Sequence, residues 1–410
     1  MRKKIVIVIP YEFYPPMSGG AIRCYYIVKE LSRAYDVTVL TKESTSLVCS
    51  IRNNEFVDVN FSFSEKVKFD FKWLGMLLPE RILNALFFKI KLRSLLVPVN
   101  SIFIDFFPVL RQLTLDLSPD VVLFENLESL YFLNSAVRSK KQKIHTVYDA
   151  HNVDHLLWDM LADEFKNKQY RQYAKFAKKI EYNLYRYTNQ VIVMSEHDKI
   201  RLMDANNHLE PADFSVIPCG VDTKKNKFFG SQTNLKSNQI LFCGSLNYLP
   251  NIQGLKWFYD CVFPLLKLAH GNFKLLIIGN CENLNDFEYL KNDPFVEILG
   301  RVEDVSIYYR NSALSVVPLL SGSGIRLKIL ESMSFGCPCV STSIGAEGIS
   351  YSEDSIIIAD TPEQFANAIV LLLSDESIYN NIRMNARKLV ESNYDWRYLI
   401  AKFVFDFEQL

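Results

Sequence analysis

The sequence predicts an α/β protein built from two doubly wound parallel sheets. Short apolar runs recur along the chain without the alternation of a half-exposed strand, as expected of parallel strands covered on both faces. Helical stretches separate these runs, which is the order of elements in a doubly wound sheet. The runs also outnumber the ~4–6 strands of a typical sheet. We therefore expect two Rossmann-like domains.

The expected strands form two series. They are 4–9, 37–41, 120–124, 144–149 and 190–194 in the first half, and 239–243, 274–278, 296–299, 314–317, 338–341 and 355–358 in the second. Expected helices include 21–34, 169–187, 252–268 and 325–335, with two more in 378–410. The stretch between residues 222 and 239 is rich in Lys, Asn, Ser and Gln, a linker composition. We place an N-terminal domain at 1–215 and a C-terminal domain at 216–394.

Composition indicates a soluble enzyme of a reducing compartment. The 46 basic residues balance the 46 acidic ones, so overall charge gives no reason to expect a nucleic-acid partner. The eight cysteines are scattered, and Cys337-Pro338-Cys339 is too tight for zinc-ligand spacing. The N-terminal apolar stretch 5–9 is shorter than the ~7–15 residues of a signal-peptide core. We expect a buried first strand and a cytoplasmic protein.

Gly19-Gly20 follows the first strand and directly precedes a helix. Paired glycines let the backbone approach a ligand, and free N–H groups at a helix start favour an anion. The G-x-G-x-x-G fingerprint is absent, and Thr41-Lys42 stands where a dinucleotide site needs an acid, so no cofactor is expected. An ordinary tight turn is the alternative.

Asp149 and His151 lie at the carboxyl end of an expected strand, the edge where open α/β sheets bind ligands. They could contact sugar hydroxyls or assist proton movement, or His151 could bond only to nearby backbone. His151 and His155 have the spacing of helical metal ligands, but Asn152 stands where H-E-x-x-H requires Glu. No metal is expected.

The segment 321–331 carries the strongest chemical pattern. Strand 314–317 leads into Ser321-Gly322-Ser323-Gly324, and an amphipathic helix is expected from about Ile325. Glycines and hydroxyls at a helix N-terminus form a cradle for a diphosphate. The P-loop pattern itself is absent.

Three charged residues complete this segment. Arg326 and Lys328 add positive charge where a helix dipole favours acids, which indicates an anionic ligand. Glu331 lies two turns into the helix, where a carboxylate could accept both hydroxyls of a ribose. The alternatives are a solvated basic face and an ion pair between Glu331 and one of the bases.

These segments together resemble the retaining glycosyltransferases of family four, which have the GT-B fold. The resemblance runs nearly end to end, and the order and spacing of its motifs are more specific than any one of them. It rests on Pro15-Pro16-x-x-Gly19-Gly20-x-x-Arg23, Asp149-Ala150-His151-Asn152, Val193-Met194-Ser195-Glu196, Ile217-Pro218-Cys219-Gly220-Val221-Asp222, Gly244-Ser245-Leu246, Gly300-Arg301-Val302-Glu303-Asp304, 322–331 and 336–342.

The resemblance implies two domains facing a central cleft. The C-terminal domain would hold a nucleoside-diphosphate sugar of the UDP or GDP type, and the N-terminal domain the acceptor. The last helix, 395–410, would cross back onto the first domain. Anomeric configuration would be kept by front-face attack that the leaving diphosphate steers, without a protein nucleophile.

Residue roles also follow from the resemblance. Glu331 corresponds to the glutamate that grips the ribose, and Gly19-Gly20 to the glycines that face the phosphates. His151 corresponds to the histidine that touches the donor sugar. The loop at Arg301-Val302 would hold the base through its backbone.

Two departures from the family pattern change these assignments. Ser323 stands where the family commonly has the first acid of Glu-x₇-Glu, so contact with the donor sugar must come from its hydroxyl or from N–H groups of Ser323, Gly324 and Ile325. The usual Arg and Lys are missing from the loop at Ser245. We expect Arg326 and Lys328 to supply that charge, with Arg326 joining His151 and Asp149 in catalysis. No D-x-D occurs, so the resemblance implies metal-independent transfer.

Residues 66–111 mix aromatics and leucines with basic residues, most densely at 71–93. This pattern is typical of an interfacial helix drawn to anionic lipid, although a core-facing helix with a basic edge fits equally. We expect a peripheral protein on the inner face of the cytoplasmic membrane if the first interpretation holds.

The leading prediction is hexosyl transfer from a nucleoside-diphosphate sugar to a glycan or lipid-linked acceptor in cell-envelope polysaccharide synthesis. A non-catalytic nucleotide- or sugar-binding protein of this fold is the alternative, because Ser323 replaces an acid. A sugar-nucleotide epimerase of the same fold is a third.

Overall fold

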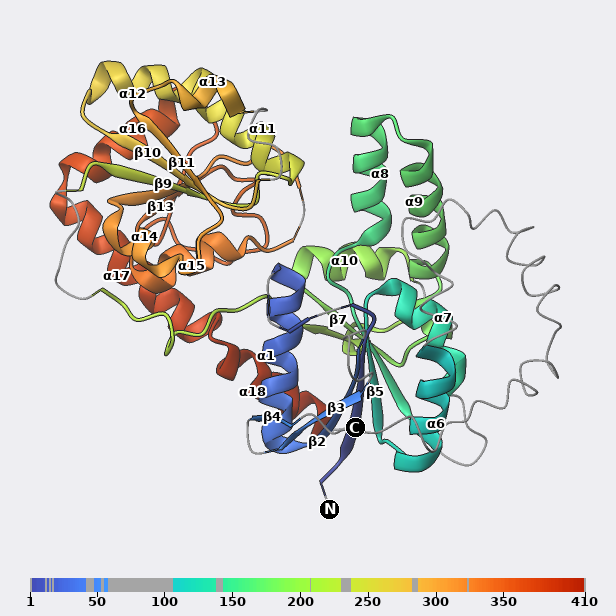
Figure 1. Cartoon of the computed structure of the whole chain (residues 1–410). Helices are drawn as coiled ribbons and strands as arrows, with labels where there is room; N and C mark the ends of the chain where they lie inside the picture. Colours follow the sequence, from blue (N-terminus) through green and yellow to red (C-terminus); the bar gives the residue numbers. More distant parts are fainter. Residues whose placement is uncertain are drawn as a thin grey trace. The chain divides into compact units, whose positions relative to one another are not determined.

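In the computed structural model the chain divides into two compact α/β units, residues 1–217 with 403–410, and residues 218–402 (Figure 1). The structure describes residues 2–11, 13–14, 16, 18–41, 48–52, 55–57, 106–137, 143–206, 208–229, 237–281, 287–322 and 324–408. The segment 71–93, which we expected at a membrane surface, lies outside these residues. Within them, no helix combines the length and apolarity needed to cross a bilayer.

The first unit is built on a sheet in the order β4-β3-β2-β1-β5-β6-β7-β8. Pairing is parallel from β2 to β8, and the short β3 and β4 extend the β2 edge in antiparallel fashion. The strands are β1 (Lys4–Ile9), β2 (Asp36–Thr41), β3 (Val48–Arg52), β4 (Glu55–Val57), β5 (Val121–Glu125), β6 (His145–Asp149), β7 (Gln190–Val193) and β8 (Phe214–Val216). Strand order reverses between β1 and β5, which makes this pair the switch point of the sheet.

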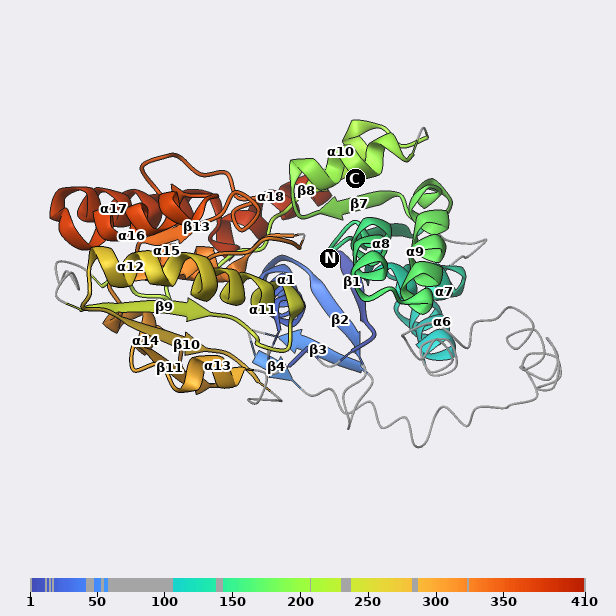
Figure 2. The same cartoon turned by 90° about the horizontal axis from the view of Figure 1, so that it is seen from above.

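Helices cover the first sheet and bury its alternate side chains. Val6, Val8, Val122 and Phe124 join one apolar cluster with the helices α6 and α7, and α8 and α9 lie side by side (Figures 1 and 2). The helices are α1 (Gly19–Ala34), α6 (Phe107–Leu117), α7 (Leu127–Val137), α8 (Asp154–Phe165), α9 (Lys168–Glu181), α10 (Glu196–Asp204) and the last part of α18 (Trp396–Glu408).

The second unit has a fully parallel sheet in the order β11-β10-β9-β12-β13-β14. Its strands are β9 (Gln239–Cys243), β10 (Lys274–Ile278), β11 (Val296–Gly300), β12 (Leu314–Val317), β13 (Cys339–Ser341) and β14 (Ile357–Ile358). Alternate residues face opposite layers: Phe242 and Ile277 pack in one cluster, and Leu241 and Ile278 in another. This two-sided burial explains why these strands appear in the sequence as unbroken apolar runs.

Two helical layers enclose this sheet (Figures 1 and 2). One contains α11 (Leu249–Trp257), α12 (Phe263–Ala269) and α16 (Pro362–Ser374), and the other α14 (Ser306–Asn311), α15 (Leu327–Phe335) and α17 (Glu376–Asn393); α13 is Glu288–Lys291. A π-helical turn at Phe258–Val262 interrupts the single helix expected at 252–268, next to Pro264. The break near Tyr394-Asp395-Trp396, expected from the sequence, is confirmed between α17 and α18.

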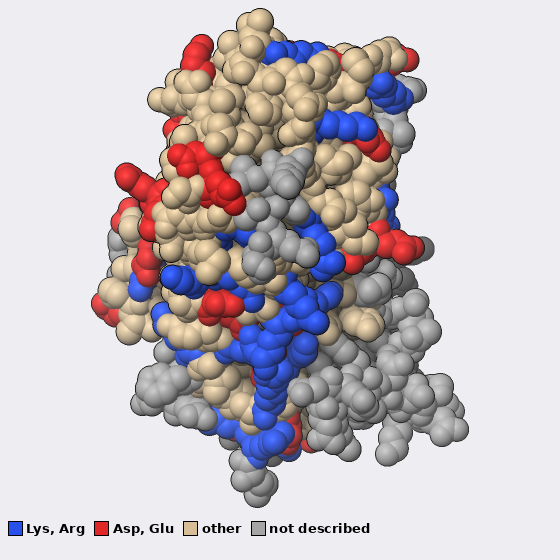
Figure 3. Space-filling view, turned by 90° about the vertical axis from the view of Figure 1, so that its left-hand side faces the viewer, with Lys and Arg blue, Asp and Glu red and all other residues tan. Residues whose placement is uncertain are grey.

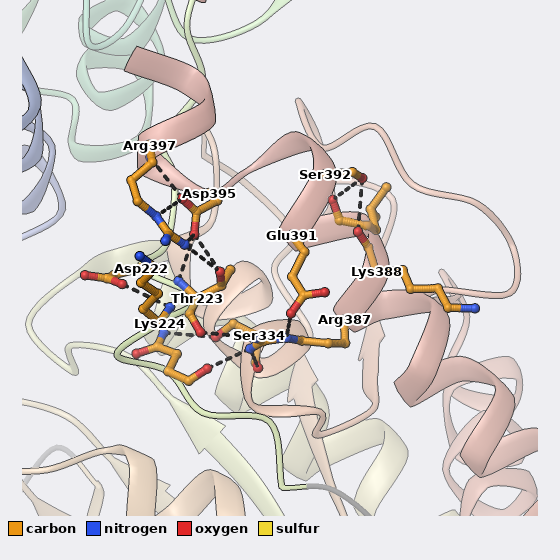
Figure 4. Close-up of polar contacts among 12 residues, drawn as sticks. Asp222, Thr223, Lys224, Ser334, Arg387, Lys388, Glu391, Ser392, Asp395 and Arg397 are labelled. Atoms are coloured by element: carbon orange, nitrogen blue, oxygen red, sulfur yellow. Dashed lines mark hydrogen bonds and ion pairs between the residues drawn. The ribbon is translucent and has the colours of Figure 1, made fainter. Parts of the chain in front are cut away.

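The beginning and the end of the second unit are joined by a polar network around Thr223 and Asp395 (Figure 4). Val221 pairs with Asp395 as an isolated parallel bridge. The Thr223 hydroxyl donates to Asp395 Oδ2 at 2.6 Å, and Arg397 Nη2 donates to the same oxygen at 2.7 Å. Burial alone would raise the pKa of Asp395, but hydrogen bonds from Arg397 and Thr223 outweigh it and lower the pKa to about 2. Arg387 donates to Thr223 O at 2.9 Å from α17.

Replacing Thr223 by valine should destabilise this network. Valine keeps the shape but removes a buried hydroxyl donor to a carboxylate, so we expect a loss of about 1.5–3 kcal/mol in unfolding free energy, measured from urea denaturation. Ser392→Ala is the matched control, because its exposed hydroxyl donates to Lys388 O and Leu389 O within α17 and such surface changes cost within about 0.5 kcal/mol. Equal losses in the two variants would contradict this account.

Charge is unevenly distributed despite the overall balance. In the view of Figure 3, Lys and Arg side chains cluster in the lower half, with some Asp and Glu side chains among them. The equal totals of 46 basic and 46 acidic residues therefore do not mean that the two charges alternate evenly over the surface.

Candidate functional site

The second sheet changes direction between β9 and β12. β10 and β11 continue from β9 on one side, and β13 and β14 continue from β12 on the other. At such a switch point the loops after the two strands diverge at the carboxyl edge, where open α/β sheets bind ligands. These loops are 244–248 and 318–326. The segment 321–331 predicted from the sequence begins at this edge.

Lys328, in the first turn of α15, brings an ammonium group to the loop after β9. Its Nζ donates to Asn251 Oδ1 at 2.7 Å, and Asn251 Nδ2 donates to Ser245 O at 2.8 Å. An added Cβ at Gly244 would lie 2.6 Å from Lys328 Nζ, so a larger residue there would displace the ammonium. Burial lowers the pKa of Lys328 to about 8. A bound anion would favour the charged amine and offset this cost.

Arg326 is the N-cap residue of α15, which begins at Leu327 rather than near Ile325 as predicted. The prediction was two residues early because Arg326 is in an extended conformation, with φ −85° and ψ 94°. Its buried guanidinium donates from Nη1 to Gly324 O. Gly322 has φ +112°, and an added Cβ there would lie 2.9 Å from Arg326 Nη2. Burial lowers the pKa of Arg326.

The remaining loop residues differ in how far the structure describes them. The Ser321 hydroxyl donates to Gln253 Oε1 at 3.0 Å, which ties the loop to α11. The Ile325 side chain is buried, so only its backbone is suited to a ligand. Ser323, predicted to contact the donor sugar, lies outside the described residues.

Glu331 lies in the second turn of α15 and is half-buried. Burial raises its pKa to about 7, although Lys328 and Lys225 oppose the shift. Arg301 and Val302 follow β11 at the same carboxyl edge, with Arg301 exposed and Val302 half-buried. One helix, α15, thus positions Arg326 at its N-cap and Lys328 and Glu331 in its first two turns. The structure places Arg301 and Val302 after β11, two strands away from β9.

A buried ion pair occupies the corresponding edge of the first unit. Arg23 donates from Nε to Asp149 Oδ2 at 2.8 Å and from Nη2 to Oδ1 at 2.7 Å, and both side chains are fully buried. Arg23 Nη1 also donates to Ile217 O at 2.9 Å. Burial alone would raise the pKa of Asp149, but Arg23 and the hydrogen bond with His151 lower it. Asp149 is therefore a buried anion that organises its neighbours.

His151 lies beside this ion pair, where β5 and β6 end. Its Nε2 is 2.8 Å from Glu125 Oε2 and 3.6 Å from Asp149 Oδ2. Burial alone would lower the pKa of His151, but hydrogen bonds with Asp149, Cys24 and Glu125 raise it well above its ordinary value. The Nδ1 edge lies against Gly20, whose added Cβ would be 3.4 Å from that nitrogen. Gly19 and Gly20 are the first residues of α1, which Ser18 caps by accepting from Ala21 N.

His151 and His155 have different carboxylate partners. His155 Nδ1 is 2.6 Å from Glu181 Oε2 on α9, whereas His151 bonds to Glu125 on β5. The two imidazoles therefore serve separate hydrogen-bonded pairs. Their spacing in the sequence reflects their positions around the start of α8.

Sequence reasoning missed two residues of this cluster, Glu125 and Arg23. Glu125 is an acid at the carboxyl end of a buried apolar strand, the same signal that singled out Asp149. Arg23 was noted only as part of a motif, and its pairing with Asp149 depends on a contact 126 positions apart. No local pattern reports such a contact.

Two family descriptions match the chain. "Glycosyltransferase Family 4" matches residues 17–225 and "Glycosyl transferases group 1" matches residues 237–375. An uncharacterised 44.6 kDa protein from the cps region of Klebsiella pneumoniae is 24% identical over 294 residues, which is 70% of this chain and 74% of that protein. The UDP-Gal:alpha-D-GlcNAc-diphosphoundecaprenol alpha-1,3-galactosyltransferase of Escherichia coli is 24% identical over 227 residues, 51% of this chain and 57% of that enzyme.

Solved structures show the same fold along the whole length. Sucrose-phosphate synthase from Thermosynechococcus elongatus superposes with a TM-score of 0.70 at 15% identity, covering 100% of this chain and 99% of that one. Anabaena Alr3699/HepE in complex with UDP and glucose superposes with a TM-score of 0.63 at 14% identity, covering 100% of both chains. The architecture predicted from the sequence, with two Rossmann-like sheets of the GT-B type, is confirmed.

Proposed function

The chain belongs to glycosyltransferase family 4, and on that basis we propose that it moves a hexosyl unit from a nucleoside-diphosphate sugar to a glycan or lipid-linked acceptor with retention of configuration. The second unit binds the donor, and the first unit binds the acceptor. Transfer requires no metal ion, because protein cations carry the charge of the diphosphate.

The observation that carries this proposal is the ammonium of the half-buried Lys328 at the switch point of the second sheet. Its hydrogen bond to Asn251 and its position beneath Gly244 hold it at the carboxyl edge. Burying a cation costs free energy unless an anion joins it. A diphosphate supplies that anion, and Arg326 adds a second positive charge at the start of the same helix.

The other site residues take the following roles in this proposal. Glu331 accepts hydrogen bonds from the ribose hydroxyls, and backbone groups at Arg301 and Val302 hold the base. The Gly19-Gly20 backbone faces the phosphates, and His151 contacts the donor sugar. Asp149 acts through Arg23 and His151, since Arg23 bonds to both of its carboxylate oxygens.

The named relatives support a place in cell-envelope synthesis. The relatives of this chain include the capsular polysaccharide biosynthesis glycosyltransferase CapM of Staphylococcus aureus, which is 28% identical over 140 residues, 32% of this chain and 37% of that enzyme. The Escherichia coli relative carries a UDP-galactose donor and a lipid diphosphate acceptor in its name. We propose a UDP-sugar as the first donor class to test, and a cytoplasmic enzyme that works at the inner face of the membrane.

A donor screen tests the proposal. The purified full-length chain is incubated with UDP-, GDP- and ADP-sugars in EDTA, with and without a lipid-diphosphate saccharide, and nucleoside diphosphate release is measured. The expected result is release with one donor class, stimulated by the acceptor, with the anomeric configuration of the product retained. Binding without release would support a non-catalytic sugar-nucleotide-binding protein, which the serine at 323 favours. A free epimerised sugar nucleotide would identify an epimerase.

A further inference from the structure

Glu125 is a buried acid for which the roles above have no use. It ends β5 at the switch point of the first sheet, and its side chain is fully buried. Oε2 lies 2.8 Å from His151 Nε2. Oε1 is buried and has no hydrogen-bond partner among the described residues. A carboxylate held in this way needs a counter-charge nearby.

The charges around Glu125 show which group supplies this counter-charge. Two carboxylates, Glu125 and Asp149, lie within 3.6 Å of the same ring nitrogen of His151. Arg23 forms the bidentate pair with Asp149 and donates to Ile217 O. Burial and then the Asp149 carboxylate raise the pKa of Glu125, and the hydrogen bond and charge of His151 and the charge of Arg23 oppose that rise. The cluster therefore holds one fixed positive charge against two acids. A proton on the imidazole balances the second acid.

The remaining neighbours do not change this balance. Cys24 Sγ lies within 4.8 Å of a ring nitrogen of His151 and hydrogen-bonds with the imidazole, and burial raises the pKa of this thiol to about 12, so it stays neutral. Tyr11 donates to or accepts from Cys24 at 3.1 Å, and burial raises the pKa of its hydroxyl as well. Asp154 at the start of α8 acts only from a distance, and burial raises its pKa.

We propose that Glu125 is a positioning residue that keeps His151 as an imidazolium and turns its Nδ1–H toward the first turn of α1. The geometry supports the orientation, because Nε2 is held between the two carboxylates while the Nδ1 edge lies against Gly20. The His151 side chain is 19% exposed, so part of the ring can contact a ligand. We take this ligand to be the donor sugar or its phosphates, to whose oxygens the imidazolium donates. This identification rests on the proposed function.

The test measures the protonation of His151 directly. Full-length protein labelled with ¹³C,¹⁵N-histidine is titrated by NMR, and the signal of His151 is assigned by its loss in His151→Gln. Glu125→Gln keeps the size and the acceptor oxygen but removes the charge, so the pKa of His151 should fall by about one unit or more. Glu125→Asp keeps the charge and should restore most of the shift.

Glu128→Gln is the matched control. Glu128 is a buried acid three residues away, hydrogen-bonded to Tyr173 rather than to His151, and its replacement should leave the His151 pKa within about 0.3 units. An unchanged His151 pKa in Glu125→Gln, or an equal fall in Glu125→Asp and Glu125→Gln, would overturn the proposal.

Turnover gives a second readout. The ratio of kcat/KM in Glu125→Gln to that of the natural chain should fall as pH rises, because the variant loses the imidazolium at lower pH. A ratio that is constant across pH would overturn the link to turnover. The NMR titration needs neither donor nor acceptor. A chain without transferase activity would therefore refute the proposed function and still report on Glu125.

Discussion

Replacing Lys328 by methionine should lower kcat/KM for the donor roughly 30- to 150-fold. The substitution keeps the length of the side chain and its packing over the Phe242 ring but removes the ammonium. Charge-assisted hydrogen bonds contribute about 1.5–3 kcal/mol, and the upper part of that range corresponds to this loss. The loss of affinity should be confined to ligands that carry a diphosphate. The natural chain should therefore bind a nucleoside diphosphate much more tightly than the monophosphate, and Lys328→Met should lose most of that preference.

Lys256→Met is the control for this variant. Lys256 lies on α11 of the same unit, is 62% exposed and pairs with Asp260 at 2.8 Å, so donor kinetics should be unchanged. Calorimetry with the two nucleotides measures the preference without catalysis. An equal weakening of monophosphate and diphosphate binding would show that Lys328 supports the fold of the site and not the diphosphate.

Replacing Glu331 by glutamine should lower donor kcat/KM roughly 30- to 150-fold as well, by weakening two hydrogen bonds from the ribose to a carboxylate. The natural chain should lose a similar factor when the donor is replaced by its 2′-deoxy analogue. Glu331→Gln should discriminate far less between the two donors, because the variant already lacks the carboxylate that accepts from the 2′-hydroxyl. Independent, additive losses would contradict the assignment of Glu331 to the ribose.

The same variant should change the pH profile. Burial raises the pKa of Glu331 to about 7 and lowers that of Lys328 to about 8 in the free protein. Donor binding needs the carboxylate and the ammonium, so kcat/KM should rise through pH 7 and fall above pH 8. Glu331→Gln should remove the acid limb, and Lys328→Met the basic limb.

The fold was predictable because both sheets are buried on two faces. Strands such as 239–243, 274–278 and 314–317 have the predicted bounds, since their central residues are buried between two apolar layers. The β3–β4 hairpin, Val48–Arg52 and Glu55–Val57, was missed. It lies at the edge of the sheet, and its residues lack a continuous apolar run. The start of α15 was placed early because an arginine N-cap gives none of the usual signals of Ser, Thr, Asp or Asn.

The candidate site residues of the second unit were predictable from the sequence, and those of the first unit only partly. Glycines and charges at 321–331 share one loop and one helix, so their proximity follows from local sequence. The cluster of the first unit joins residues from α1, β5 and β6, which are distant in the chain. The sequence singled out His151 and Asp149 because they follow the end of a strand. Their partners Arg23 and Glu125 can be identified only from the folded structure, in which α1, β5 and β6 are neighbours.

The bridge between Val221 and Asp395 has a consequence for the modularity of the chain. Val221 N donates to Tyr394 O at 2.8 Å, and Trp396 N donates to Val221 O at 3.2 Å, so the segment that enters the second unit and the one that leaves it are neighbouring strands of backbone. A domain whose entry and exit coincide can be inserted into, or exchanged between, host chains without altering the path of either neighbour. The second unit can in this way be exchanged as a single module between chains that differ in their first unit.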